Sequence, residues 1–257
     1  MNPLDGCYAK LRQAEGHAQA LHEEIEAFQK LRGLRIGHKA DPQSSDYIFY
    51  VEAIKEPPLL KWGCRMGDVL HDLHSALDHL AWQLVLFRLG HEPPEKEAKA
   101  VACPIALTRS DFDSLTVVKM LDPAHVSTLR GLQPYQRGDR KRAEGHPLAV
   151  IKQLSNIDKH RLVHVGDVRL KDFSLPQPTA KDYEITRIVA APGDVPLVDG
   201  QELARIEGTV TGPEPEIEGH AKLTGYVALR DRSSVQHRLD QFGRAARHFI
   251  DQFQSSL

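Results

Sequence analysis

The chain has 257 residues, of which 41% are hydrophobic, enough for one large domain or two small ones with a proper core. Its 33 basic and 35 acidic side chains nearly cancel, which excludes a uniformly basic protein that coats nucleic acid but leaves room for a local basic patch. No run of about 18 apolar residues occurs, and the first residues lack the pattern of a secretory signal. Three isolated cysteines, Cys7, Cys64 and Cys103, suit a reducing compartment. We therefore expect a cytoplasmic protein with no membrane partner.

Two apolar stripes predict long helices near the two ends of the sequence. From residue 4 to 28 the apolar residues alternate at spacings of three and four, the pattern of an amphipathic helix. This helix should end near Arg32 and Gly33, because glycine permits a left-handed cap. A matching stripe over 235–253 predicts a last helix with Ser233 or Ser234 as its N-cap. The two helices could pack on each other or, in a homodimer, on a second copy of the chain.

The middle of the chain carries further helical signals. Leucines recur on one face of a segment that Gly90 ends. Other segments begin with proline, which suits the first helical position, or follow Asp or Ser, which suit the N-cap. We expect helices over 67–89, over 109–120 after Ser110 or Asp111, over 122–132 after Asp122, and over 147–161 from Pro147.

Strand signals dominate elsewhere. The segment YIFYVEAI (47–54) is rich in β-branched and aromatic residues. After residue 162, short and partly alternating segments are separated by Gly, Pro and Asp turns. We expect strands at 163–170, 183–190, 203–210 and 221–229, and a charged loop at 136–146.

These patterns predict an α+β fold, with about four longer helices packed with an antiparallel sheet. We expect one compact domain over residues 1–257. Its helical part would be 1–162 and 231–257, and its strand-rich part would be 163–230.

The segment GDVLHDLHSALDHLAW (67–82) holds the densest set of groups that could do chemistry. Its polar face carries His71, His74 and Asp78 on one stripe, with His79 farther round. Imidazole and carboxylate suit zinc or iron, so the first three side chains could bind a divalent metal such as zinc. Asp78 could instead orient a histidine that acts as an acid or base without metal. A third interpretation is a solvated helix face that does no chemistry.

A second polar cluster lies in the segment LSNIDKHR (154–161). On a helical wheel, Asp158 and Arg161 fall beside the apolar residues of this helix. A charge on a buried face needs a partner. The partner of Asp158 is either Arg161, one turn away, or the histidine-rich face of the 67–89 helix. In the second case the two clusters form one chemical centre.

These two segments, GDVLHDLHSALDHLAWQLV and LSNIDKHRLVH, resemble a group of uncharacterised bacterial proteins of about this length. The first also resembles a helix of the HEPN superfamily, whose helical bundles often act as metal-independent ribonucleases. The superfamily signature is an arginine followed after four to six residues by a histidine, and Arg65–His71 matches it. The resemblance implies that His71 or His79 would exchange a proton with the ribose 2′-hydroxyl or the leaving oxygen. It also implies that Arg65 would hold the phosphate and that Asp78 would orient the base.

Three classes of function follow. The first is an HEPN-like RNA-cleaving or RNA-binding protein that needs no cofactor and has RNA as its partner. The second is a metal-dependent enzyme that uses His71, His74 and Asp78, and the third is a non-catalytic interaction module. In the first class, the basic stretch 137–142 would supply sequence-independent phosphate contacts. The candidate catalytic residues of the first class are Arg65, His71, Asp78, His79 and Asp158.

Overall fold

The structure is a computed structural model that describes residues 2–30, 34–161, 163, 165–176 and 178–257. These residues form helices and antiparallel strands, which confirms the predicted α+β class. The chain divides into two compact units, a helical unit and a strand unit. Residues 22–59, predicted to belong to the helical part, lie in the strand unit. That the whole chain forms one compact domain stays a prediction. The helical unit comprises 1–21, 60–163 and 236–257, and the strand unit comprises 22–59 and 164–235.

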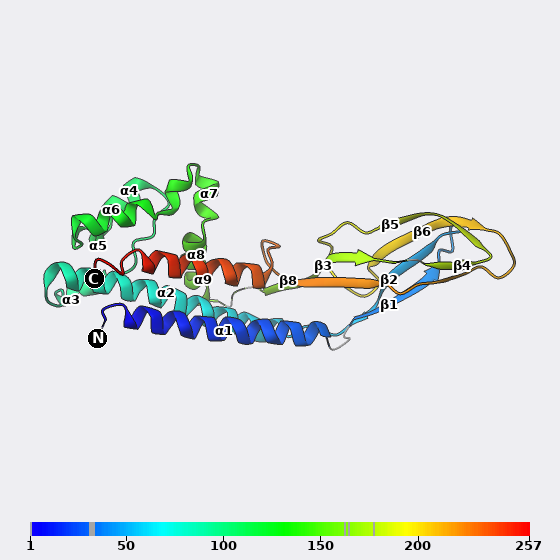
Figure 1. Ribbon diagram of the computed structural model, residues 1–257, viewed down its shortest axis with the longest axis horizontal. Coiled ribbons are helices and arrows are strands. Elements are labelled where there is room, and N and C mark those ends of the chain that lie inside the picture. The colour runs from blue at the N-terminus through cyan, green and yellow to red at the C-terminus, as the bar shows by residue number, and fades with distance from the viewer. Residues whose placement is uncertain (1, 31–33, 162, 164, 177) are drawn as a thin grey trace. The chain divides into compact units, whose positions relative to one another are not determined.

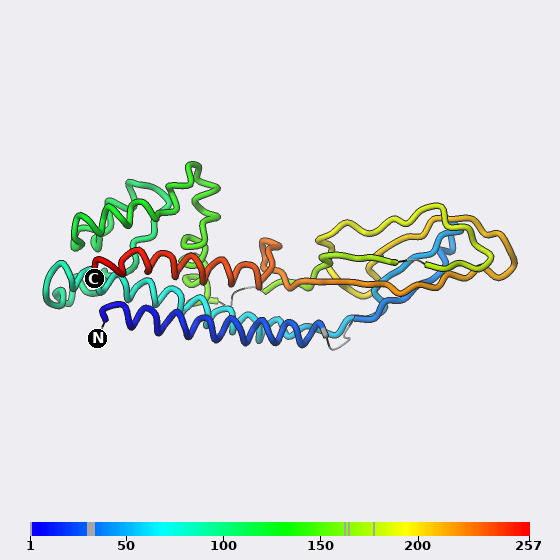
Figure 2. The backbone as a smooth tube through the Cα atoms, viewed as in Figure 1, coloured from blue at the N-terminus to red at the C-terminus, as the bar shows by residue number. Residues whose placement is uncertain are grey.

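Three long helices run side by side in the helical unit: the first part of α1 (Asp5–Lys30), α2 (Leu59–Leu89) and α9 (Val235–Asp251) (Figure 1, Figure 2). Lys10 on α1 forms an ion pair of 2.9 Å with Asp72 on α2. Tyr8 on α1 donates a hydrogen bond of 2.7 Å to Asp251 on α9. The predicted packing of the two terminal helices on each other is therefore confirmed within a single chain.

The apolar stripes of these helices form the core of the helical unit. Each fully buried large side chain contributes about 1.5–3 kcal/mol to folding. The predicted end of α1 at Arg32 and Gly33 lies outside the described residues. None of the described helices is long and apolar enough to cross a membrane. Buried members of the core include Leu4, Leu11, Leu21, Trp62, Leu73, Leu77, Leu84, Phe242, Phe249 and Phe253.

The helix predicted over 67–89 is longer than expected, because α2 begins at Leu59. We had expected Gly67 to mark its start. Gly67 and Gly63 lie inside the helix and are both buried. At Gly67 the side chain of Asp158 occupies the space that a Cβ atom would need. Glycine is therefore used here for a close approach and not for helix termination.

The remaining helices are α3 (Glu95–Ala98), α4 (Arg109–Ser114), α5 (Thr116–Lys119), α6 (Pro123–Gly131), the 3₁₀ helix η1 (Pro134–Arg137), α7 (Arg140–Glu144) and α8 (Pro147–Asp158). Asp122 caps α6 as predicted. Thr108 caps α4 in place of Ser110 or Asp111, because its hydroxyl accepts a hydrogen bond from the Asp111 N–H. The charged stretch 136–146, expected to be a loop, is partly helical.

The strand unit contains a four-stranded antiparallel sheet with the order β1-β2-β6-β5 and two two-stranded ribbons, β3-β8 and β4-β7. Buried side chains such as Phe49, Val51 and Ile206 recur along its central strands and form its core. Residues 34–54 supply two strands of the larger sheet, which we expected to come mainly from 163–230. The strands are β1 (Leu34–Ala40), β2 (Tyr47–Ile54), β3 (Val165–Ser174), β4 (Thr179–Lys181), β5 (Tyr183–Ala190), β6 (Glu202–Val210), β7 (Glu216–Glu218) and β8 (Lys222–Leu229).

Candidate functional site

The last turn of α8 packs directly on α2 inside the helical unit. A Cβ atom at Gly67 would lie 2.5 Å from Oδ1 of Asp158, so a larger residue at this position would collide with the carboxylate. Burial raises the pKa of Asp158, the Val163 N–H lowers it by donating a hydrogen bond, and the negative charge of Asp68 raises it. His71 interacts with this carboxylate through its charge, and no hydrogen bond joins the two in the part of the chain that is described. The two polar clusters thus meet at this point.

Asp78 orients a histidine, but that histidine is His74. Oδ2 of Asp78 lies 3.3 Å from Nδ1 of His74, and its Oδ1 accepts a hydrogen bond of 2.8 Å from the Cys103 N–H. The His74 side chain is only 14% exposed. Burial lowers the pKa of His74, while the nearby carboxylate of Asp78 opposes this effect. The result is a sheltered imidazole whose orientation is fixed by a carboxylate that is itself fixed by the backbone.

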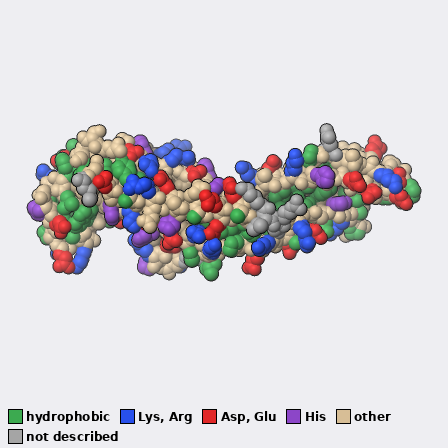
Figure 3. All heavy atoms as spheres, turned by 60° about the horizontal axis from the view of Figure 1, so that its bottom comes forward, with side chains coloured by type: hydrophobic (Ala, Val, Ile, Leu, Met, Phe, Trp, Pro, Cys, Tyr) green, Lys and Arg blue, Asp and Glu red, His purple; other side chains and the backbone are tan. Residues whose placement is uncertain are grey.

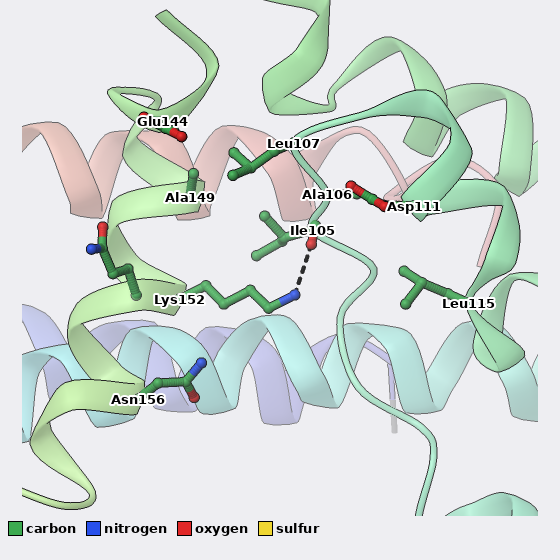
Figure 4. Close-up of a pocket in the computed structure, with 10 residues that line it drawn as sticks. Ile105, Ala106, Leu107, Asp111, Leu115, Glu144, Ala149, Lys152 and Asn156 are labelled. Atoms are coloured by element: carbon green, nitrogen blue, oxygen red, sulfur yellow. Dashed lines mark hydrogen bonds between the residues drawn. The ribbon is translucent and has the colours of Figure 1, made fainter. Parts of the chain in front are cut away.

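Two lysines of the α8 region act on this imidazole. The positive charges of Lys159 and Lys152 lower the pKa of His74 further. Lys152 also donates a hydrogen bond of 2.8 Å to the carbonyl of Ile105, across a cavity (Figure 4). An ammonium group has three donors, so Lys152 retains donors for a ligand. His74 therefore lies near two cationic groups in addition to the carboxylate of Asp78.

The cavity beside Lys152 has a volume of about 630 Å³ and lies within the helical unit. Its wall is formed by one face of α8 and by the extended segment that leads into α4 (Figure 4). This volume falls within the range of small-ligand sites, which combine apolar walls with a few polar groups. The lining residues are apolar (Ile105, Ala106, Leu107, Leu115, Ala149) or polar (Asp111, Glu144, Lys152, Gln153, Asn156).

The five predicted catalytic residues do not share one site. Arg65 and His71 are six residues apart on α2, which places them about 120° apart around the helix axis. Arg65 is half-buried, whereas His71 is exposed. His79 packs toward α1, because a Cβ atom at Gly6 would lie 3.1 Å from its Nδ1 atom. Asp78 is part of α2 and contacts His74 one turn before it, whereas Asp158 comes from α8 and contacts α2 at Gly67.

The alternative metal site receives no support. Among the described residues, no three His, Cys, Asp or Glu side chains converge so that they could hold a metal ion. His74 and Asp78 pair with each other, but His71 is exposed and does not complete a set with them. His71, His74 and Asp78 therefore lie on the same side of α2, but their side chains do not converge as metal ligands would.

Sequence analysis missed the α8 side of this site. Ala149, Lys152, Gln153 and Asn156 recur at spacings of three, one and three, which is one face of a helix. That spacing could have identified them as a surface stripe. The facing segment that contains Ile105 has no comparable pattern, because its position depends on tertiary packing.

No family model matches the chain, and no curated protein or solved structure matches it either.

Proposed function

We propose that this protein binds RNA and cleaves it without a metal ion, with His74 as the catalytic base. The observation that carries the proposal is the His74–Asp78 pair, sheltered from solvent and flanked by two ammonium groups. This assignment keeps the type of chemistry that the HEPN resemblance implies. It moves the proton acceptor from His71 or His79 to the histidine that a carboxylate orients.

The chemistry needs a neutral imidazole, a nucleophile and positive charge. With its pKa lowered, His74 is neutral near pH 7, and its Nε2 atom can take the proton of a ribose 2′-hydroxyl. The 2′-oxygen then attacks the adjacent phosphorus, which forms a 2′,3′-cyclic phosphate and releases the 5′-oxygen of the next nucleotide. His71, one turn away, protonates that oxygen when its imidazole is charged. Lys152 and Lys159 stabilise the charge that develops on the phosphate.

The cavity provides a place for an unpaired nucleotide. Its apolar wall suits the face of a base, and the carboxamides of Gln153 and Asn156 can hydrogen-bond to a base edge. Lys152 lines this cavity and its charge also acts on His74, so a phosphate that binds Lys152 would lie near the catalytic imidazole.

Incubation of the full chain with single-stranded RNA in EDTA tests the proposal. Cleavage should persist with the chelator and should yield cyclic phosphate ends. We expect His74→Gln to lower the rate by at least about 100-fold, since general base catalysis contributes on the order of 10²- to 10⁴-fold. Because burial lowers the pKa of His74, the acidic limb of the pH–rate profile should lie below the ordinary histidine value of about 6.5.

A matched control is His91→Gln, which replaces an exposed histidine whose Nδ1 atom lies 2.8 Å from the carbonyl oxygen of its neighbour Glu92. This variant should cleave RNA at the wild-type rate. Cleavage that stops in EDTA, or that survives His74→Gln unchanged, would contradict the proposed mechanism. RNA binding with no cleavage under any condition would leave only the binding part of the proposal.

A further inference from the structure

A second cavity of the helical unit is strongly basic. Its volume is about 610 Å³, and η1, α7, the first residues of α8 and one face of α9 form it. Figure 3 shows groups of Lys and Arg side chains on the surface of the helical unit. The residues that line the cavity include no carboxylate: they are Arg137, Arg142, Gly145, His146, Pro147, Arg238, Gln241, Arg244 and Ala245.

Two of the four arginines carry a positive charge that no ion pair with a described carboxylate offsets. Arg142 lies 3.2 Å from Asp139, but both side chains are largely exposed, and such a pair contributes little. Arg137 lowers the pKa of His146, an effect second to that of burial, so its positive charge reaches across the cavity. Neither Arg137 nor Arg244 forms an ion pair with a described carboxylate. An anion that enters the cavity would therefore meet several guanidinium groups at once.

Guanidinium groups suit oxyanions such as phosphate and carboxylate. Their planar arrangement of N–H donors matches two phosphate oxygens at a time, and they remain charged at any physiological pH. The first turn of α8 lines the same cavity, and the positive end of its helix dipole adds to the attraction. A cavity with four arginines can hold more than one phosphate, as a chain of phosphodiesters presents.

We infer that this cavity, the arginine pocket, binds consecutive backbone phosphates of single-stranded RNA. The inference rests on RNA as the substrate of the proposed function, and it adds an anchoring site separate from the His74 centre. Contacts of its arginines with backbone phosphates carry no sequence information, so the proposed anchoring is independent of sequence. The basic stretch 137–142, which was predicted to contact phosphate, supplies one wall of the pocket. The other wall comes from α9, for which no such contact was predicted.

Binding of a labelled 2′-O-methyl oligouridylate of roughly 12 nucleotides, a typical footprint of a single-strand groove, tests the inference by fluorescence anisotropy. The 2′-O-methyl group removes the nucleophile, so the assay reads binding without cleavage. We expect the double variant Arg137→Gln/Arg244→Gln to bind about 10-fold more weakly. The slope of log K against log salt, measured between roughly 50 and 200 mM, should fall in magnitude by about 1.4.

The matched control is Arg12→Gln/Arg88→Gln, which removes two exposed charges from other faces of the helical unit. It should change affinity and slope far less. Equal losses in the two double variants would show that only net charge matters and would overturn the inference. Arginine-dependent binding to phosphatidylserine vesicles, without binding to the oligonucleotide, would overturn it as well.

The two proposals fail in different ways. Loss of cleavage in His74→Gln protein, with unchanged binding of the oligonucleotide by both double variants, removes the arginine pocket and keeps the catalytic site. Binding that depends on Arg137 and Arg244, with no cleavage of unmodified RNA, keeps the pocket and removes the catalytic site.

Discussion

The two units use arginine in opposite ways. In the strand unit, Arg205 pairs with Asp41, Asp46 and Glu202, and these interactions raise its pKa far above the ordinary value. In the helical unit, four arginines line one cavity, and no carboxylate is among the described residues that line it. The first arrangement surrounds one cation with several carboxylates, whereas the second gathers several cations around one cavity. A guanidinium is thus informative about function only when the residues around it are known.

Arg169 shows why the strand unit needs its arginines. Its side chain is only 9% exposed, and it pairs with Asp167 and Asp194 while Tyr226 donates a hydrogen bond to Asp194. Removal of this cation would leave the carboxylates of Asp167 and Asp194 close together, with only the exposed Arg232, 3.7 Å from Asp194, to offset their charge. The shared ion pairs of the helical unit are more exposed: Asp113 pairs with Arg109 and Arg130, and all three side chains are at least 40% exposed.

Replacement of Arg169 should therefore give the largest effect. We expect Arg169→Met to lower the unfolding temperature of the strand unit by roughly 5–10 °C. Hydrogen exchange of peptides from β3 and β8 measures this unit directly. The control Arg187→Met removes an exposed cation that lies 4.0 Å from Glu207, and its effect should stay within about 2 °C. Similar losses in the two variants would contradict the structural role of the Arg169 cluster.

Alkaline pH should act through the helical unit, which contains all three cysteines of the chain. Burial raises the pKa of the Cys7 thiol to about 11. An unfolded thiol ionises near pH 9, so the folded state keeps a proton that the unfolded state has lost. The contribution of this thiol to the free energy of unfolding is therefore complete below pH 9 and falls as the pH rises toward 11. The loss reaches about 2–3 kcal/mol near pH 11.

Urea unfolding followed by tryptophan fluorescence measures this loss, because Trp62 and Trp82 both lie in the helical unit. In Cys7→Ala protein the alkaline loss should shrink, whereas Cys64→Ala, which removes an exposed thiol, should retain it. An identical pH dependence in the two variants would assign the effect to other groups.

Two glycine-to-alanine variants in the helical unit should change its free energy of unfolding in opposite directions, because only one of the glycines lies at the contact between α2 and α8. Gly67→Ala should destabilise the helical unit by about 1–3 kcal/mol, because the added methyl group collides with Asp158. Gly16→Ala on α1 meets nothing within 4 Å and should stabilise the unit by about 0.5–1 kcal/mol, the usual gain in helix propensity. Urea unfolding measures both, and a stabilising Gly67→Ala would show that Asp158 is not held against α2.

The sequence predicted the elements with strong periodicity. The apolar stripes gave the terminal helices, and the strand predicted at 183–190 coincides with β5. Weak signals failed where tertiary contacts decide the outcome. Gly67, at the predicted start of a helix, proved to be a close-contact position inside α2, and a charged stretch proved to be partly helical because Asp139 caps it.

The candidate site was predictable only in part. The sequence singled out Asp78 as an orienting carboxylate, but it could not show which histidine on the same helix face would receive that contact. Asp158 approaches α2 at Gly67, while His79 packs toward α1 at Gly6. The Lys152 cavity depends on a segment without periodicity, and the arginine pocket combines residues more than 90 positions apart, so no local pattern could reveal either.

The hydrogen bond between Tyr8 and Asp251 spans 243 positions of the chain, and it has a consequence for synthesis of the protein. A ribosome that adds roughly 5–20 residues per second needs on the order of 10–50 s to proceed from one partner to the other. During this interval the apolar stripe of α1 has emerged but its α9 counterpart does not yet exist. The apolar surface of α1 that α9 covers therefore stays exposed until α9 has been synthesised. Slow translation would prolong this exposure and favour aggregation.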